Sequence, residues 1–145
     1  MHIDNPFKWK NLVRNGRCIH ECVGAVIKRD DKYLLVERRF PPFGFGLVGG
    51  HMDKGEYNEQ ALTREIFEEI GAHAKHFNHL FDMEDLKRAH FKMHFTHIYS
   101  CEIDREPKVN YESKSYGWFG AAELATLQLT DTTRLIFIKL GVLQK

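Results

Sequence analysis

A glycine pair followed by a short acidic helix constrains the fold of this chain more than any other segment. Gly49 and Gly50 belong to a loop, and helix-forming residues then run from residue 58 to residue 70. Gly71 follows that run, where glycine commonly ends a helix in the left-handed conformation. An apolar stripe predicted to face the core repeats every four residues and consists of Leu62, Ile66 and Ile70.

Three carboxylates lie on the flank of the predicted helix. Glu65 and Glu69 are four residues apart and so lie roughly 40° apart around the helix axis, while Glu68 lies about 60° to the other side of Glu65. Acidic side chains crowded on one helical face repel one another. A divalent cation relieves the repulsion, and hard carboxylate oxygens suit Mg²⁺ or Mn²⁺. The spacing therefore predicts a metal site beside the glycine loop.

The segment from Gly50 to Ala72 resembles the Nudix box. The small apolar Ala72 stands at the final aliphatic place, and the other fixed positions are met by Gly50, Glu56, Arg64, Glu65, Ile66, Glu68, Glu69 and Gly71. The resemblance implies an α/β fold, a Nudix-like α/β/α sandwich with a mixed, partly antiparallel sheet. It also implies metal-dependent hydrolysis of a pyrophosphate bond in a nucleoside diphosphate linked to another moiety. Nucleoside triphosphates, sugar nucleotides and ADP-ribose are the leading substrates.

The same resemblance implies roles for the residues of the box. Glu65, Glu68 and Glu69 are expected to face the metal, with the backbone carbonyl near Gly49 as a further ligand. Glu65 or another of these acids can serve as general base. Arg64 completes the expected catalytic group by pairing with Glu56 or a helix acid, which would fix the loop against the helix.

Several assignments outside the box stay open in the sequence. Arg38 and Arg39 end a predicted strand just before the glycine loop, where they suit either phosphate contact or a solvated edge. Family members often find a general base on a later loop, and the candidates here are Glu84, Glu102, Asp104 and Glu112. Residues typical of the ADP-ribose and dinucleoside polyphosphate subfamilies are absent near Lys87 and at 88–90. The substrate and the number of metal ions are therefore undetermined.

Two other functions are compatible with the same fold. A non-catalytic nucleotide-binding regulatory module tends to lose carboxylates of the box, and this chain has lost none. A diphosphate isomerase is disfavoured because the intact box resembles that of the hydrolases. Hydrolysis is therefore the predicted activity.

Length and composition favour one ordinary globular domain over residues 1–145. A net charge of +1 gives no reason to expect a nucleic-acid polymer or a membrane surface as partner. No run of about twenty apolar residues is present. We expect a cytoplasmic protein with a small-molecule nucleotide as its partner, and the family resemblance makes a homodimer possible.

Cysteine and histidine patterns carry weaker signals. The cysteines Cys18, Cys22 and Cys101 are odd in number and lack a framework spacing, so we expect reduced thiols. Cys18 and Cys22 lie in a predicted strand without a second cysteine pair, so we expect no zinc site there. One histidine series has spacing three but lies in an extended stretch, which scatters it over both strand faces: His73, His76 and His79. Of the series His90, His94 and His97, the first two share a strand face and can line a substrate cleft or simply occupy strand positions.

Local patterns predict the order of elements along the chain. Strands are expected at 17–29, 32–39, 47–48, 72–84, 90–103 and 116–119, with loops at 40–46 and 102–115. Further helices are expected at 121–125 and at 131–140, the last with Asp131 as N-cap and with Leu135, Ile136 and Leu140 on one side. Trp118 is assigned to the core, whereas Phe43 and Phe45 fit either the core or a nucleotide base.

Overall fold

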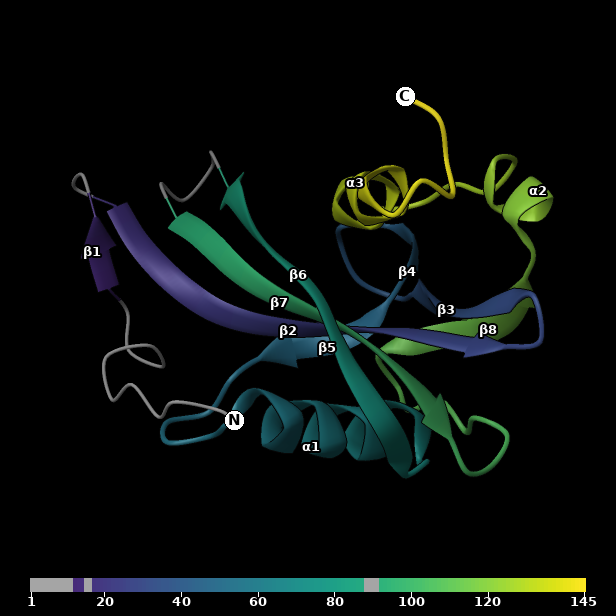
Figure 1. Cartoon of the computed structure of the whole chain (residues 1–145), viewed down its shortest axis with the longest axis horizontal. Helices are drawn as coiled ribbons and strands as arrows, with labels where there is room; N and C mark the ends of the chain where they lie inside the picture. The colour runs from purple at the N-terminus through teal and green to yellow at the C-terminus, as the bar shows by residue number, and fades with distance from the viewer. Residues whose placement is uncertain (1–11, 15–16, 88–91) are drawn as a thin grey trace.

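A mixed sheet lies between two helical layers in this protein (Figure 1). The computed structural model describes residues 12–14, 17–87 and 92–145. Helix α1 (Asn58–Ile70) covers one face of the sheet, and α3 (Asp131–Lys139) covers the other. A short helix, α2 (Ala121–Leu124), precedes α3. This arrangement confirms the predicted α/β/α sandwich.

The sheet combines parallel and antiparallel neighbours, as predicted. Its strands follow the order β4-β3-β2-β7-β6, with β1 and β5 also paired to β2 and β8 paired to β3. Only the β2–β7 pair is parallel among the pairs of the described residues. The strands are β1 (Leu12–Arg14), β2 (Arg17–Arg29), β3 (Lys32–Arg38), β4 (Gly44–Gly46), β5 (Val48–His51), β6 (Ala74–Lys87), β7 (Lys92–Ile103) and β8 (Ser113–Phe119).

The predicted hairpin of β2 and β3 forms only at its turn. Lys28 pairs with Tyr33 and Arg29 with Lys32. Beyond these pairs β3 joins β4 and β8, whereas β2 joins β5 and β7. The divergence of β2 from β3 leaves an edge of β2 to which β5 binds, and β5 carries the glycine pair.

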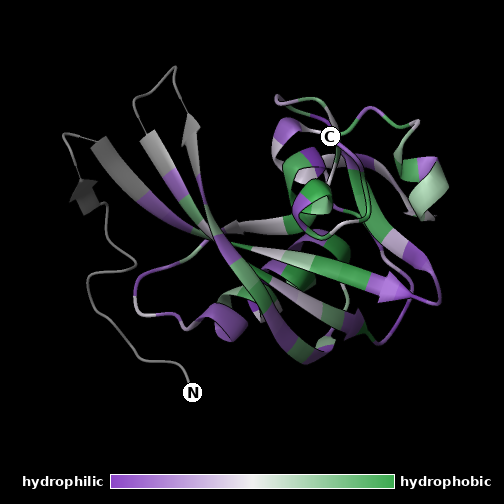
Figure 2. Ribbon diagram, turned by 45° about the horizontal axis from the view of Figure 1, so that its top comes forward, coloured by the Kyte–Doolittle hydropathy of each residue, from purple (hydrophilic) through white to green (hydrophobic). Residues whose placement is uncertain are grey.

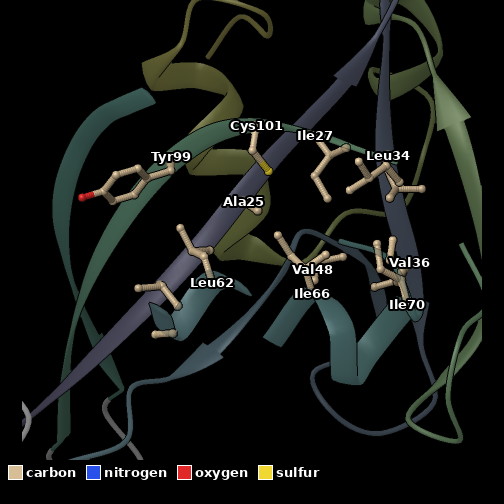
Figure 3. Close-up of a cluster of buried hydrophobic side chains, with 14 residues drawn as sticks. Ala25, Ile27, Leu34, Val36, Val48, Leu62, Ile66, Ile70, Tyr99 and Cys101 are labelled. Atoms are coloured by element: carbon tan, nitrogen blue, oxygen red, sulfur yellow. The ribbon is translucent and has the colours of Figure 1, made fainter. Parts of the chain in front are cut away.

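Helix α1 matches its prediction in extent and in buried face. Leu62, Ile66 and Ile70 have no exposed surface. They pack on residues of β2, β5 and β7 in one hydrophobic cluster (Figure 3). Gly71 ends the helix with a φ of 64°, a conformation that glycine adopts without steric cost. Local periodicity was sufficient to place this helix.

Three predictions about the flanking segments are wrong in part. Residues 40–46 are not all loop, because Gly44–Gly46 pairs with β3 as strand β4. The N-cap of α3 is Thr130, whose Oγ1 accepts a 3.3 Å hydrogen bond from the backbone N–H of Thr133, so Asp131 is the first helical residue. Leu135 and Ile136 do not share one environment as expected, because Ile136 is buried together with Phe137 whereas Leu135 is 39% exposed.

The hydrophobic residues gather where the sheet lies between the helices (Figure 2). Within the described residues, no helix is both long enough and apolar enough to cross a membrane.

Candidate active site

Strand β5 holds the glycine pair in close contact with β2 and α1. A Cβ atom on Gly49 would lie 2.2 Å from the carbonyl oxygen of Val23, and one on Gly50 would lie 2.8 Å from the Glu65 carboxylate. Any side chain would therefore displace either the strand or the acid. These glycines are what allow the β5 backbone to approach the acidic flank of the helix.

The carboxylate of Glu69 is anchored on that backbone. The N–H of Gly49 donates a 2.9 Å hydrogen bond to Oε2 of Glu69. Burial, followed by the negative charge of Glu65, raises the pKa of Glu69 to about 8. Burial also raises the pKa of Glu65, despite its hydrogen bond to Arg64. The ionised forms of these two inward carboxylates are unfavourable in the absence of a positive charge, and a bound cation would stabilise them.

Glu68 differs from the other two acids in its environment. Its side chain is 54% exposed, and Oε2 accepts a 3.2 Å hydrogen bond from Nη1 of Arg64. The side chain of Glu65 is 14% exposed. The helix therefore presents Glu65 and Glu69 inward and Glu68 at the rim.

Arg64 connects the glycine loop to the helix. Its Nε and Nη2 atoms donate to the two carboxylate oxygens of Glu56 at 2.8 and 3.0 Å, which is a bidentate pair. Nη1 donates to Glu65 at 2.9 Å, and Nη2 donates to the carbonyl of His51 at 3.0 Å. Burial is the largest single influence and would raise the pKa of Glu56, but the hydrogen bonds from Arg64 and the Asp53 backbone, together with the charge of Arg64, lower that pKa overall.

The loop between β7 and β8 docks on the C-terminal end of α1. The backbone N–H and the side-chain amide of Asn110 donate to the carbonyls of Glu69 and Glu68, at 3.1 and 3.0 Å. Nδ2 of Asn110 also lies 3.4 Å from Oε1 of Glu112. The charge of Glu112 contributes to the raised pKa of Glu69, which brings Glu112 into the same electrostatic site.

The other candidate bases have different surroundings. Glu102 pairs with His76 at 2.8 Å, and Asp104 accepts hydrogen bonds from the His73 backbone and from Arg105. Glu84 lies on β6 opposite Phe95. Among these four acids, only Glu112 interacts with Glu69 in the described part of the chain. Asn110, which positions this loop, was missed because its role depends on a contact with a helix some forty residues earlier.

Comparison with known proteins identifies the family. Residues 19–139 match the family model of the NUDIX domain. The chain belongs to the Nudix family. It is 30% identical over 135 residues to the nucleoside triphosphatase NudI of Enterobacter sp. strain 638, and the match covers 83% of this chain and 96% of the relative.

A second relative is more similar over a shorter stretch. The ADP-ribose pyrophosphatase of Methanocaldococcus jannaschii is 45% identical over 68 residues, covering 44% of this chain and 40% of the relative. Among solved structures, a MutT Nudix hydrolase from Burkholderia pseudomallei has a TM-score of 0.75 and 30% identity, covering 81% of this chain and 94% of that one. These likenesses support a Nudix hydrolase that cleaves pyrophosphate bonds in nucleotide substrates. Members of the family generally depend on a divalent metal.

The two arginines of the Nudix protein that precede the glycine loop lie close to the acids. Arg38 donates from Nε to the carbonyl of Pro42 at 2.8 Å, and its charge lowers the pKa of Glu69 against the larger effect of burial. Nε of Arg39 donates to the carbonyl of Tyr111 at 2.9 Å. The structure therefore brings Arg39 to the loop that contains Glu112 and places Arg38 where its charge acts on Glu69.

The histidines of the Nudix domain separate into different environments. His76 pairs with Glu102, and His79 pairs with Asp82 at 2.7 Å. His97 is buried between Glu21 and Asp82, at 2.5 and 2.8 Å. His90 lies outside the described residues, so a shared face with His94 is untested.

The aromatic candidates and the thiols also take definite positions. Phe43 is 57% exposed, whereas Phe45 packs edge-on against Phe119. Trp118 packs against the cluster that includes α1, and the guanidinium of Arg29 lies 4.3 Å from its ring centroid. The predicted thiols Cys22 and Cys101 are buried and form no disulfide, and the side chain of Cys18 lies outside those described.

Proposed function

We propose that this Nudix domain is a nucleoside triphosphate pyrophosphohydrolase that releases a nucleoside monophosphate and pyrophosphate. NudI, a nucleoside triphosphatase by name, supports this substrate because it aligns over 96% of its own length. The match to the ADP-ribose pyrophosphatase covers 40% of that protein and so says less about the substrate-contacting regions. ADP-ribose and sugar nucleotides are the second candidates, as the sequence alone left them open.

The observation that carries the proposal is the hydrogen bond from Gly49 to Glu69 beside the half-buried Glu65. We assign metal binding to Glu65, Glu69 and the Gly49 carbonyl, with Glu68 completing the set from the rim. Their oxygen donors and the close approach of the glycine backbone fit a hard cation, and Mg²⁺ is proposed over Mn²⁺. When bound, such an ion neutralises phosphate charge and lowers the pKa of a coordinated water.

The remaining residues act on the substrate or on each other. We assign proton acceptance from the attacking water to Glu112, with Glu65 as the alternative base within the box. Arg38 and Arg39 contribute positive charge toward the phosphates, which offsets the anionic site. Arg64 touches no substrate in this scheme. It holds Glu65 and the loop in fixed positions by its pairing with Glu56.

A panel of nucleotides tests the proposal. Purified protein with Mg²⁺ is incubated with nucleoside triphosphates, ADP-ribose and sugar nucleotides, and the release of nucleoside monophosphate is measured by chromatography. Triphosphates are expected to be hydrolysed with the highest kcat/KM. Preference for ADP-ribose or a sugar nucleotide would overturn the substrate. A panel with binding but no metal-dependent turnover would favour the regulatory module instead.

The finer expectations from the sequence belong to the same proposal. We propose that residues 1–145 act as one domain in the cytoplasm, without a nucleic-acid polymer or a membrane as partner, and that the protein forms a homodimer. Fractionation of cells tests the location, and analytical ultracentrifugation tests the oligomeric state.

A further inference from the structure

A second group of metal-ligating side chains lies outside the carboxylate site. Cys22 on β2, His51 on β5 and His94 on β7 each bring one ligand atom to within 4.8 Å of the other two. Sγ of Cys22 lies 3.8 Å from Nδ1 of His94. The thiol is buried, His94 is half-buried and His51 is exposed, so the group can be reached from solvent on one side.

Strand register explains why these residues meet. Cys22 lies directly opposite His51 in the antiparallel β2–β5 pair. His94 lies opposite His20 in the parallel β2–β7 pair, and His20 is two residues from Cys22. Residues two apart, or directly opposite, share a face of a sheet. All four side chains therefore belong to one face.

That face is the one turned away from α1. Val23, the neighbour of Cys22, belongs to the hydrophobic cluster that includes α1. A Cβ atom on Gly50, the neighbour of His51, would point at Glu65 on α1. Because neighbouring residues of a strand face opposite sides, the Cys–His group and the carboxylate site lie on opposite faces of the sheet.

The donor set selects a different class of ion from that of the carboxylates. A thiolate and neutral imidazoles favour Zn²⁺ and similar transition metals, whereas Mg²⁺ requires oxygen ligands. Zinc–sulfur and zinc–nitrogen bonds of about 2.3 and 2.0 Å place the donors of a tetrahedral site roughly 3.3–3.6 Å apart. The 3.8 Å distance between Cys22 and His94 is close to that spacing. The donor atoms of the three residues lie within 4.8 Å of one another, so the side chains have to move closer together when the ion binds.

The histidine rings themselves favour a ligand role. The ring centroids of His51 and His94 lie 5.2 Å apart, and the ring of His20 lies 5.5 and 5.7 Å from theirs. Neutral imidazole is the form that binds metal. His20 or a water can fill the fourth position.

We propose that Cys22, His51 and His94 bind one zinc-class ion. The ion would tie β2, β5 and β7 together on the face of the sheet turned away from α1. His51 directly follows Gly50, so the ion would also hold the strand that carries the glycine pair. This site does not depend on the proposed substrate. It is compatible with the expectation that Cys18 and Cys22 form no zinc pair, because the partners of Cys22 come from other strands.

Cobalt substitution tests the proposal directly. Full-length protein is first freed of bound metal by a chelator. Mg²⁺ is then added to saturate the carboxylate site, and the protein is titrated with Co²⁺. The expected result is a thiolate-to-cobalt charge-transfer band that reaches its maximum at one equivalent and is displaced by Zn²⁺. Absence of that band in the native protein would overturn the proposal.

Variants identify the ligands. Cys22→Ser should abolish the charge-transfer band and weaken zinc binding by about tenfold or more. Cys101→Ser is the matched control, because this second buried thiol belongs to the cluster around α1 and should keep the band. Cys18→Ser should also keep it. The proposed ligand set is refuted if the band persists in Cys22→Ser, or if Cys18→Ser loses the band while Cys22→Ser keeps it.

Folding of each variant is checked by circular dichroism before metal is added. If Cys22→Ser does not fold, His94→Ala is used as the test variant, because His94 is only half-buried. In this variant the visible cobalt bands should change and zinc binding should weaken. His79→Ala is the histidine control, because His79 pairs with Asp82 and does not belong to the proposed Cys–His ligand set. Equal zinc affinity in His94→Ala and native protein would contradict the proposal.

Discussion

The backbone N–H of Gly49 donates a 2.9 Å hydrogen bond to the side chain of Glu69, twenty residues later in the chain. The bond joins the glycine strand β5 to the acidic face of α1. Since Glu69 is buried and close to Glu65, its pKa is raised to about 8 by burial and then by that neighbouring charge. The anchor therefore holds an acid whose ionised form is only partly offset by the charge of Arg38 until a cation binds.

Glu69→Gln should abolish activity and yet stabilise the metal-free protein. The pKa of Glu69 is raised in the folded state, so folding is progressively destabilised as pH rises from the ordinary carboxyl value of about 4.3 to the folded value. Glutamine cannot ionise, and its amide oxygen can still accept the N–H of Gly49. Urea unfolding should therefore show a stability gain that is larger at about pH 9 than at about pH 5.

Magnesium supplies the control for this variant. Added Mg²⁺ should stabilise the native protein and should stabilise Glu69→Gln much less, because a ligand is lost. An equal magnesium effect on both proteins would exclude Glu69 as a ligand.

Arg64→Lys should lower kcat by roughly 10–100-fold, because lysine cannot form the bidentate pair with Glu56 while also reaching Glu65 and His51. Steady-state kinetics with a hydrolysed nucleotide would measure the loss. Arg105→Lys is the control, since Arg105 pairs only with the exposed Asp104 within the described residues and should retain full kcat. A normal rate in Arg64→Lys would mean that the pairing geometry is unimportant.

Glu112→Gln should lower kcat by roughly 10²–10⁴-fold if Glu112 accepts the proton of the attacking water. The acidic limb of the pH–rate profile should disappear with it, because the titrating base is gone. Glu102→Gln is the matched control substitution. Glu102 lies on β7 opposite Lys75 of β6 and pairs with His76, away from the helix acids. An unchanged profile in Glu112→Gln would return the assignment to Glu65.

His97→Gln should destabilise the protein by about 1–3 kcal/mol near neutral pH, because Glu21 and Asp82 lose a shared buried partner. Burial lowers the pKa of His97, but its hydrogen bonds to Glu21 and Asp82 outweigh burial and raise that pKa. Burial raises the pKa of Asp82, but hydrogen bonds from His79 and His97 lower it overall.

The sign of each shift defines the pH window of this effect. The contribution of a raised histidine pKa is complete below about 6.5 and is lost as pH rises through the folded value. The contribution of a lowered aspartate pKa is present above about 3.9 and is lost as pH falls through the folded value. The stability difference between native protein and variant should therefore be largest between about pH 4 and about pH 6.5 and should shrink by about pH 9. Urea unfolding of chelated protein at these values measures it, and a difference that grows with pH would contradict the assignment.

Helix α1 shows how far local pattern reaches. The spacing of Leu62, Ile66 and Ile70 and the position of Gly71 are properties of one short segment, and the structure agrees with both. The last helix shows the limit. The sequence placed Leu135 on one side of this helix with Ile136, but which face of α3 is buried depends on how the helix packs on the sheet, and Leu135 is exposed whereas Ile136 is buried.

The amino-acid sequence by itself determined the Nudix box, the helix that carries it and the class of sandwich, because helical periodicity and glycine preferences act over a few residues. Only the tertiary structure decided that Glu112, rather than Glu84, Glu102 or Asp104, interacts with Glu69. Only strand register brought Cys22, His51 and His94 together. Those choices depend on contacts between segments tens of residues apart, and the local preferences of a chain carry no information about which distant strands will pair.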